Sequence, residues 1–471
     1  MKKSKVWAVL MLAIYAYPAF AQSDSSLRLG TLVNWILQEH PLAKAAKAET
    51  QIGAATLQTA RGAFDPQIQW SQVSKTLGGK PYYEGEQWQL QSYTRWAVAW
   101  ESGFERMLGD AANPAQSTPD QGFYYQGLSM PLLRDLVTDY RRTGLQKAKI
   151  AQAASAWERN DQINSLLSEV FLDYIDWTQS WEQLQQANLA LTLSQNRLEG
   201  MRILFEQGSC NALDTLEAFS QFAAYASKQA EYSYKEAKGR IMLSRHLWIN
   251  DVPYLLRDDA EPESQHLDQL SNWVDLVRNQ ISSDSTWYNL HPQLALAQLK
   301  IDSKNWELKY WRNEMLPQLD LKYQWLGSNW NSFPNSLQTP DNQRFGLYFQ
   351  SPLFLRSARG QIQSARTELA QLSWQYDQKQ RDVLAKQLAL SQGVDRYQEA
   401  YRWSAQQAES LQKLYEAEWE KFQAGDVQFF ILNTRESRFV QSAISQWDAW
   451  AAYRQSEVAL LFQSGLLPAL L

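Results

Sequence analysis

The chain has 471 residues, a hydrophobic fraction of 45% and a formal net charge of −5 at pH 7. This composition indicates a folded protein with a sizeable core, and it gives no reason to expect nucleic acid as a partner. The single cysteine excludes an intramolecular disulfide, and the four histidines show no metal-ligand spacing. Because the sequence also has no glycine-rich phosphate loop or nucleophile motif, we expect neither a cofactor nor enzymatic activity.

The first 21 residues are typical of a secretory signal peptide. Three lysines precede an apolar run at residues 6–17, and Ala19 and Ala21 supply the small residues of a cleavage site. The run is too short for a transmembrane helix, and no later run approaches roughly twenty apolar residues. We therefore expect an exported mature chain that begins at Gln22 and carries a formal charge of −8 (−5 − 3).

The rest of the chain repeats its landmarks in one order, which indicates an internal duplication. The paired positions are His40 and His291, Pro66 and Pro317, Pro131 and Pro352, and Gly208 and Gly425. The first two pairs are 251 residues apart, the third 221 and the fourth 217. The predicted repeats span 22–248 and 291–471, with a linker and a short helix at 249–290 between them. The drop from 251 to 221 places about 30 extra residues between the strands of the first repeat (251 − 221).

Each repeat is expected to contain a long helical hairpin, at 134–248 and 357–465. No proline interrupts 134–206, and apolar residues such as Ile163, Leu167 and Val170 recur at steps of three and four, which is coiled-coil spacing. At 1.5 Å per residue, the long helices of the two hairpins would reach roughly 110 and 100 Å. The sequence therefore predicts a mainly α-helical protein.

Strands are expected at about 66–130 and 316–352, because polar and apolar residues alternate there. Leu319, Leu321, Tyr323 and Trp325, for example, alternate with polar residues. The aromatic residues predicted to face lipid or the membrane interface are Trp70, Trp88, Trp96, Trp100, Tyr323, Trp325, Phe345 and Phe349. An aromatic face opposite a polar face fits a membrane β-barrel with a wet lumen. A soluble sheet packed on the helices is the alternative, because alternation alone does not separate the two.

These features together resemble the TolC-type outer-membrane efflux protein family over essentially the whole mature chain. The resemblance rests on the signal peptide, the duplicated order of elements, the phrases SMPLLR and SPLFLR after strands, and the Phe-x-x-Gly turns at Gly208 and Gly425. The segment ESGFERMLG at 101–109 is similar to a longer-looped variant of the family. The order and spacing of these features, rather than any single motif, carry the resemblance.

The resemblance implies a homotrimer in which each chain gives four strands to a twelve-stranded barrel above a helical tunnel in the periplasm. Four strands do not close a lumen alone, and three-fold symmetry supplies the closure. The implied function is a passive exit duct in the outer membrane for efflux or type I secretion. Its partners would be outer-membrane lipid, a periplasmic adaptor (membrane fusion protein) and an inner-membrane transporter. Each repeat needs an even number of crossings, so one of the three candidate strands of the first repeat, at 66–76, 87–104 and 122–130, should not cross; the sequence leaves open which.

The resemblance also places two sites at the turns that end the long helices. The adaptor-docking turns would contain Gly208, Ser209, Gly425 and Asp426, and the periplasmic aperture would be controlled by Asp214, Glu217, Asp426 and Arg435, with Glu436 as a further candidate. The family places an acid six residues after each turn glycine. Asp214 fits this position, but Ile431 and the later Thr434 do not, so the acidic constriction is incomplete.

A soluble periplasmic coiled-coil adaptor or scaffold is the alternative function. An adaptor would need compact β-domains flanking one helical hairpin. This chain has two hairpins and amphipathic aromatic strands, which favour the channel.

Overall fold

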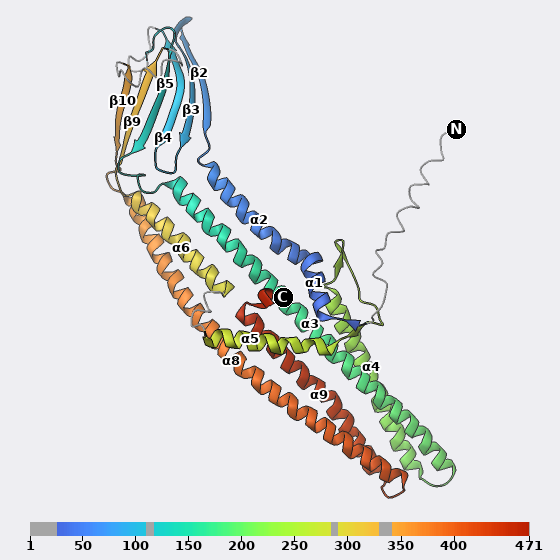
Figure 1. Ribbon diagram of the computed structural model, residues 1–471. Coiled ribbons are helices and arrows are strands. Elements are labelled where there is room, and N and C mark those ends of the chain that lie inside the picture. Colours follow the sequence, from blue (N-terminus) through green and yellow to red (C-terminus); the bar gives the residue numbers. More distant parts are fainter. Residues whose placement is uncertain (1–25, 110–116, 284–290, 329–341, 471) are drawn as a thin grey trace, which may run out of the picture. The chain divides into compact units, whose positions relative to one another are not determined.

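The computed structural model describes residues 26–109, 117–283, 291–328 and 342–470 (Figure 1). The expected signal peptide at 1–21 lies outside them. The chain divides into two compact units, each built from three separate segments. A sheet unit contains the described residues of 42–166, 277–389 and 462–470, and a hairpin-tip unit contains those of 26–41, 167–276 and 390–461. Among the described residues, no helix combines the length and the apolar character needed to cross a membrane.

The sheet unit is organised around one antiparallel sheet of six strands in the order β10-β9-β5-β4-β3-β2 (Figure 1). The strands are β2 (Gln67–Leu77), β3 (Lys80–Tyr93), β4 (Ala99–Leu108), β5 (Phe123–Pro131), β9 (Gln318–Gly327) and β10 (Gln343–Gln350). The sheet has six strands, whereas the sequence predicted five, of which four were expected in a barrel. The first repeat contributes four strands and the second repeat two.

The predicted strand at 87–104 is two strands joined by a turn at 94–98. The Thr94 amide and hydroxyl both donate to the Val98 carbonyl, at 2.9 and 2.7 Å, and Ala97 has a φ of 65°. Ser92 and Thr94, which interrupt the apolar alternation, lie at the end of β3 and in this turn. The β3–β4 hairpin accounts for the extra residues of the first repeat and restores an even number of strands there.

The β2–β3 hairpin closes with two consecutive glycines. Gly78 and Gly79 have φ values of 58° and 80°, and Leu77 pairs with Lys80 on either side of them. Two central residues with positive φ define the type I′ turn, whose twist matches that of the flanking strands. Because glycine adopts these angles without a Cβ penalty, the sequence Gly78-Gly79 fixes the register of this hairpin.

Matching helices flank the strands of the two repeats. Pro41 and Pro292 occupy the first helical position of α2 (Pro41–Gly62) and α6 (Pro292–Asn313), where proline is favoured, and both helices have 22 residues. The long helices α3 (Tyr140–Glu206) and α8 (Arg356–Gln423) have 67 and 68 residues and contribute to both units. The returning helices α4 (Ala212–Ser244) and α9 (Phe429–Ser464) have 33 and 36 residues. The element lengths therefore agree with the predicted duplication.

The long helix expected from residue 134 begins six residues later, at Tyr140 (140 − 134). The backbone continues the sheet instead, because Leu132 and Arg134 donate their amides to the carbonyls of Leu319 and Pro317. Asp135 then adopts a φ of 69°, which a right-handed helix does not allow.

The hairpin-tip unit buries apolar residues between its helices. One cluster joins Ala190 of α3, Tyr225 of α4, Tyr415 of α8 and Ile444 of α9. The remaining elements of this unit are α1 (Leu29–Glu39), the parallel pair β1 (Ser26–Leu27) and β8 (Glu261–Pro262), the hairpin β6 (Trp248–Ile249) and β7 (Val252–Pro253), and most of α5 (Gln269–Ser283). A short helix, α10 (Leu467–Leu470), ends the described chain in the sheet unit.

Candidate functional site

The sheet has one apolar face, which is exposed to solvent in the single chain. Paired residues share a face, and one row across the strands contains Phe345, Tyr323, Leu128 and Trp100. At the edges of the sheet, Ile68 of β2 is 75% exposed and Phe349 of β10 is 69% exposed. A face of this size and polarity normally lies against a partner or a membrane. Because it is not packed on helices of the described chain, the soluble-sheet alternative loses its main support.

Seven of the eight predicted aromatic residues lie on this apolar face. They are Trp70, Trp88, Trp100, Tyr323, Trp325, Phe345 and Phe349. The eighth, Trp96, lies in the β3–β4 turn rather than in a strand and is 84% exposed. Sequence reasoning missed Phe104 and Tyr124, which extend the row of Trp70 and Trp88 across β4 and β5.

The apolar face ends in polar residues beyond the Trp70–Trp88 row. The next row of the same face contains Gln72, Glu86 and Arg106. The Trp88 indole Nε1 donates to Glu86 Oε1 at 2.9 Å, so this ring has an apolar body and a polar edge that is already satisfied. This arrangement is typical of an aromatic belt at a boundary between an apolar and an aqueous phase.

The opposite face of the sheet is polar and carries paired charges. Lys322 Nζ lies 2.6 Å from Glu101 Oε2, and Glu101 also accepts from Gln91 and Gln324 at 3.3 and 3.2 Å. Arg344 donates through both terminal nitrogens to Glu105 at 3.1 Å. These charges come from strands of both repeats, so the pairing of β5 with β9 brings together residues that lie more than 200 positions apart in the sequence. We call this side the polar face.

Both predicted turn glycines end their helices in the same way. Gly208 has a φ of 71° and Gly425 a φ of 84°. Ser209 N donates to Leu204 O at 2.8 Å, and Asp426 N donates to Lys421 O at 3.0 Å, which is the longer bond of a Schellman motif. No atom lies within 4 Å of the position of a Cβ on either glycine. The glycines are therefore required by backbone angle and not by close packing.

The turns and the adjoining helices pack on one another through apolar side chains. Leu198 and Met201 of α3, Ala218 of α4 and Phe429 of α9 form a buried cluster, and the partly buried Cys210 and Phe422 pack against it. The Cys210 thiol lies 3.4 Å from the carbonyl of Met201. Cys210 thus has a packing role in the first turn.

The four predicted aperture residues lie near these turns but do not form one cluster. Asp214 closes a capping box with Asn211 at the start of α4. Glu217 accepts from the Asn433 amide of α9 at 3.0 Å. Asp426 is exposed in the second turn, and Arg435 is half-buried on α9. The further candidate Glu436 is fully buried and ion-paired with Arg197 of α3, which places it in the helix packing rather than on a surface.

The positions that depart from the acidic pattern have other environments. Ile431 is 42% exposed, and the Thr434 hydroxyl donates to the carbonyl of Phe430 within α9. Neither residue supplies a negative charge. Sequence reasoning did not find the Arg197–Glu436 pair, because the position of a charged residue in a heptad pattern does not indicate which residue of another helix it contacts.

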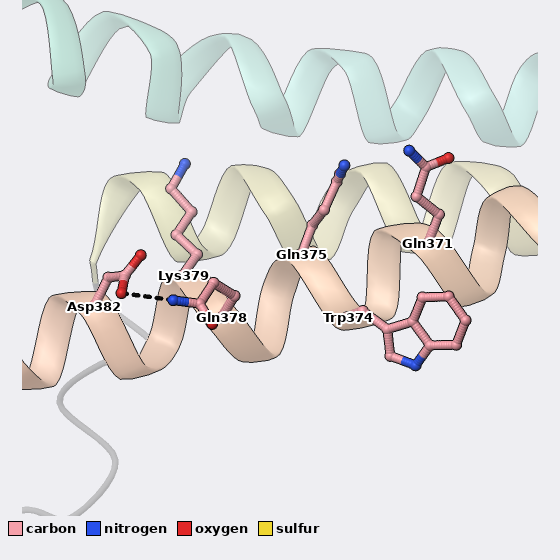
Figure 2. A pocket seen from close by; sticks show the side chains of 6 residues that line it. All are labelled: Gln371, Trp374, Gln375, Gln378, Lys379 and Asp382. Carbon is pink, nitrogen blue, oxygen red and sulfur yellow. Dashed lines mark hydrogen bonds between the residues drawn. The ribbon is translucent and has the colours of Figure 1, made fainter.

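One pocket of about 360 Å³ lies along α8 in the sheet unit (Figure 2). It is lined by one stripe of the helix, Gln371, Trp374, Gln375, Gln378, Lys379 and Asp382. Figure 2 shows the Trp374 ring beside the helix, and Gln378 donates to Asp382 at 2.8 Å. Trp374 is 70% exposed, so the stripe is an open helix surface and not an enclosed ligand site. Within the part of the chain that the structure describes, no three metal-ligating side chains come together.

Comparison with known proteins gives similarity in structure but not in sequence. No protein-family model matches the chain, and no curated protein matches it significantly. The CmeC outer membrane channel of Campylobacter jejuni is 13% identical with a TM-score of 0.63, over 93% of this chain and 85% of that one. The outer membrane protein VceC of Vibrio cholerae is 12% identical with a TM-score of 0.61, over 93% and 95% of the two chains. The open state of the MtrE outer membrane channel of Neisseria gonorrhoeae is 14% identical with a TM-score of 0.62, over 93% and 89%.

These similarities cover nearly the whole chain at low identity, and they establish the fold. The mainly helical fold with a sheet, expected from the resemblance to TolC-type outer-membrane efflux proteins, is confirmed.

Proposed function

We propose that this chain, which has the fold of those outer membrane channels, forms the outer-membrane exit duct of a tripartite efflux or type I secretion system. The duct is passive, without cofactor or catalysis, and its helical tunnel extends into the periplasm. The observation that carries the proposal is the sheet, whose exposed apolar face lies opposite a polar face with paired charges. Such a sheet suits a wall between lipid and water.

A trimer supplies what the single chain lacks. The sheet ends in two edge strands, and each open backbone group at a lipid-exposed edge costs several kcal/mol. Closure by identical chains around an axis removes both edges.

Exposed apolar side chains on the helices also support association of several copies. Large exposed residues occur along α4 and α8, namely Leu213, Leu216, Tyr234, Trp374, Leu388 and Trp403. In an assembly of identical chains, these residues would be covered by helices of the neighbouring copies. The stripe that includes Trp374 in Figure 2 is one such surface.

The tips of the two hairpins are the proposed contact sites for partners. Gly208, Ser209, Gly425 and Asp426 shape the turns on which a periplasmic adaptor, the membrane fusion protein, would dock. The inner-membrane transporter would deliver its cargo through that adaptor. Asp214, Glu217, Asp426 and Arg435 would control the aperture, and with Ile431 in the second repeat the constriction would be only weakly acidic.

Fractionation of cells that express the protein tests this proposal. We expect the mature chain in the outer membrane as a detergent-resistant trimer that dissociates on boiling, and its deletion should raise drug susceptibility or abolish secretion of a cargo. A monomer in the soluble periplasmic fraction would contradict the channel and favour the adaptor alternative.

A further inference from the structure

We infer that each chain contributes all six strands to the barrel, so that the trimer closes eighteen strands (3 × 6) by pairing β2 of one chain with β10 of the next. This inference rests on the proposed function and departs from the twelve strands that the family resemblance implies. The partner of each open sheet edge would be a second copy of this chain.

The β2–β3 and β3–β4 hairpins belong to the same continuous ladder as the other strands. β3 pairs with β4 from Glu84 and Leu108 to Tyr93 and Ala99, and β2 pairs with β3 along its whole length. The strands β2, β3 and β4 have 11, 14 and 10 residues, at or above the length of about 9–11 that a tilted membrane strand needs. The inserted residues therefore form full-length strands and not a short surface loop.

The apolar face extends onto β2 and β3 over two rows of the same face. One row contains Ile68, Leu90 and Trp325, with Ser102 and Gln126 between them, and the adjacent row contains Trp70 and Trp88. If the β2–β3 hairpin lay outside the membrane, these side chains would face water. An aromatic row that runs at one level across β2, β3, β4 and β5 is expected of a lipid-facing wall.

The strand ends are staggered in the way that a closed barrel requires. The row in which β2 begins joins Gln67, Gln91, Glu101, Gly127 and Gln324. Gln324 lies six residues beyond Gln318, where β9 begins (324 − 318). Strands that tilt around a barrel axis show such a progressive shift in register. The shift runs in one direction across the sheet, so β3 and β4 follow the same tilt as the others.

The two edges have compatible direction and polarity. Because the sheet has an even number of antiparallel strands, β2 and β10 run in opposite directions, and pairing between chains stays antiparallel. On β2, Ile68 and Trp70 lie on the apolar face and Gln69 lies on the polar face. On β10, Phe349 lies on the apolar face and Gln350 on the polar face. Continuing the stagger by one strand places Gln350 of the neighbouring chain beside Gln69. The barrel would then be roughly half as wide again as one of twelve strands, because diameter grows about linearly with strand number.

Cysteine cross-linking distinguishes this closure from a twelve-stranded one that keeps the observed strand pairing but leaves the β2–β3 hairpin outside the barrel, so that β4 is the edge that meets β10. In a Cys210→Ser background, Gln69→Cys plus Gln350→Cys tests the β2–β10 pair, and Ala99→Cys plus Gln350→Cys tests the β4–β10 pair. A thiol cross-linker that reaches about 8 Å spans opposite and diagonal residues on adjacent strands. It does not span the three strand spacings, about 14 Å, that separate β4 from the next β10 in an eighteen-stranded barrel.

We expect the first pair to give covalently linked trimers on a denaturing gel, and we expect the second pair and each single cysteine to give none. A trimer in the outer membrane that links through Ala99, or that does not link through Gln69, would overturn the eighteen-stranded closure and leave the proposed function intact. If the unsubstituted protein forms no trimer in the outer membrane, the proposed function itself is overturned.

A pair of adjacent substitutions on β2 gives a second readout. Ile68→Arg puts a charge on the apolar face, and Gln69→Arg puts the same charge on the polar face. We expect Ile68→Arg to lose most of the outer-membrane trimer and Gln69→Arg to retain it. Equal amounts of trimer from both variants would show that β2 lies outside the membrane and would overturn the inference.

Discussion

Leu321→Arg is the substitution whose effect depends most directly on the assignment of the sheet faces. Leu321 lies in a row between Met130 of β5 and Leu347 of β10, in the apolar band of the sheet. In the proposed barrel an arginine there would place its guanidinium toward lipid, which costs about 2–4 kcal/mol near the bilayer midplane and less near the interface. Because the proposed trimer would contain the substitution three times, we expect a large loss of assembled protein.

The neighbouring Lys322 supplies a control on the polar face, but the structure changes how it must be used. Lys322 is the ion-pair partner of Glu101, whose side chain is 6% exposed. Lys322→Gln alone leaves that carboxylate with only amide donors, and breaking a buried pair costs about 3–5 kcal/mol in general. Glu101→Gln with Lys322→Gln removes both charges at once, and such paired replacement is close to neutral. The double variant is therefore the matched control.

The amount of heat-dissociable trimer in outer membranes and its melting temperature in detergent measure these effects. We expect Leu321→Arg to be depleted, Lys322→Gln to melt early, and the double variant to approach the unsubstituted protein. If Leu321→Arg accumulates and melts like the unsubstituted protein, the assignment of the apolar face to lipid is refuted.

Three further predictions concern the hairpin-tip unit. Gly208→Val or Gly425→Val should leave the trimer intact but abolish efflux, most sharply when both are changed, whereas Gly208→Asn should retain efflux because asparagine tolerates positive φ. A trimer gel run beside a susceptibility assay measures both effects, and loss of the trimer itself would contradict this prediction. Glu436→Gln, which leaves the Arg197 charge buried and uncompensated, should destabilise by about 3–5 kcal/mol, and Arg197→Met with Glu436→Leu should restore stability in thermal melts; equal melts of the single and double variants would oppose this. Burial and the nearby His246 lower the pKa of His40 from 6.5 to about 4, so the folded state resists protonation and stability should fall by up to about 3 kcal/mol as pH drops through that window; a His40→Gln variant with an unchanged pH dependence of melting would exclude this residue as the cause.

Much of the fold could be read from local patterns, because each pattern has a local physical cause. The alternation of 318–325, the prolines that open α2 and α6, and the turn glycines all fix backbone conformation within a few residues. The predicted number of strands was wrong at 87–104, because no glycine or proline separates β3 from β4 there. The chain reverses at 94–98 through the hydrogen bond of Thr94 to Val98 and through a left-handed conformation at Ala97. Neither threonine nor alanine is a residue type from which such a turn is predicted.

The candidate site could be predicted only in part, because pairing across the sheet decides which residues meet. The aromatic face follows from alternation and was found. The Glu101–Lys322 and Glu105–Arg344 pairs depend on the register of β4, β5, β9 and β10 and could not be predicted from either repeat alone. Asp214 was chosen by its offset from a turn glycine, yet it is engaged in a helix cap. Glu436 was chosen as a charge near the second turn, yet it is buried.

Electron cryo-microscopy of the protein extracted from outer membranes in detergent tests the central claim most directly. The account predicts a three-fold symmetric particle in which the sheets of three chains close one barrel around a lumen lined by the polar face, with helices continuing from one end. A particle with one chain, or a trimer whose sheets remain open with the Trp70–Trp88 row in solvent, would contradict it.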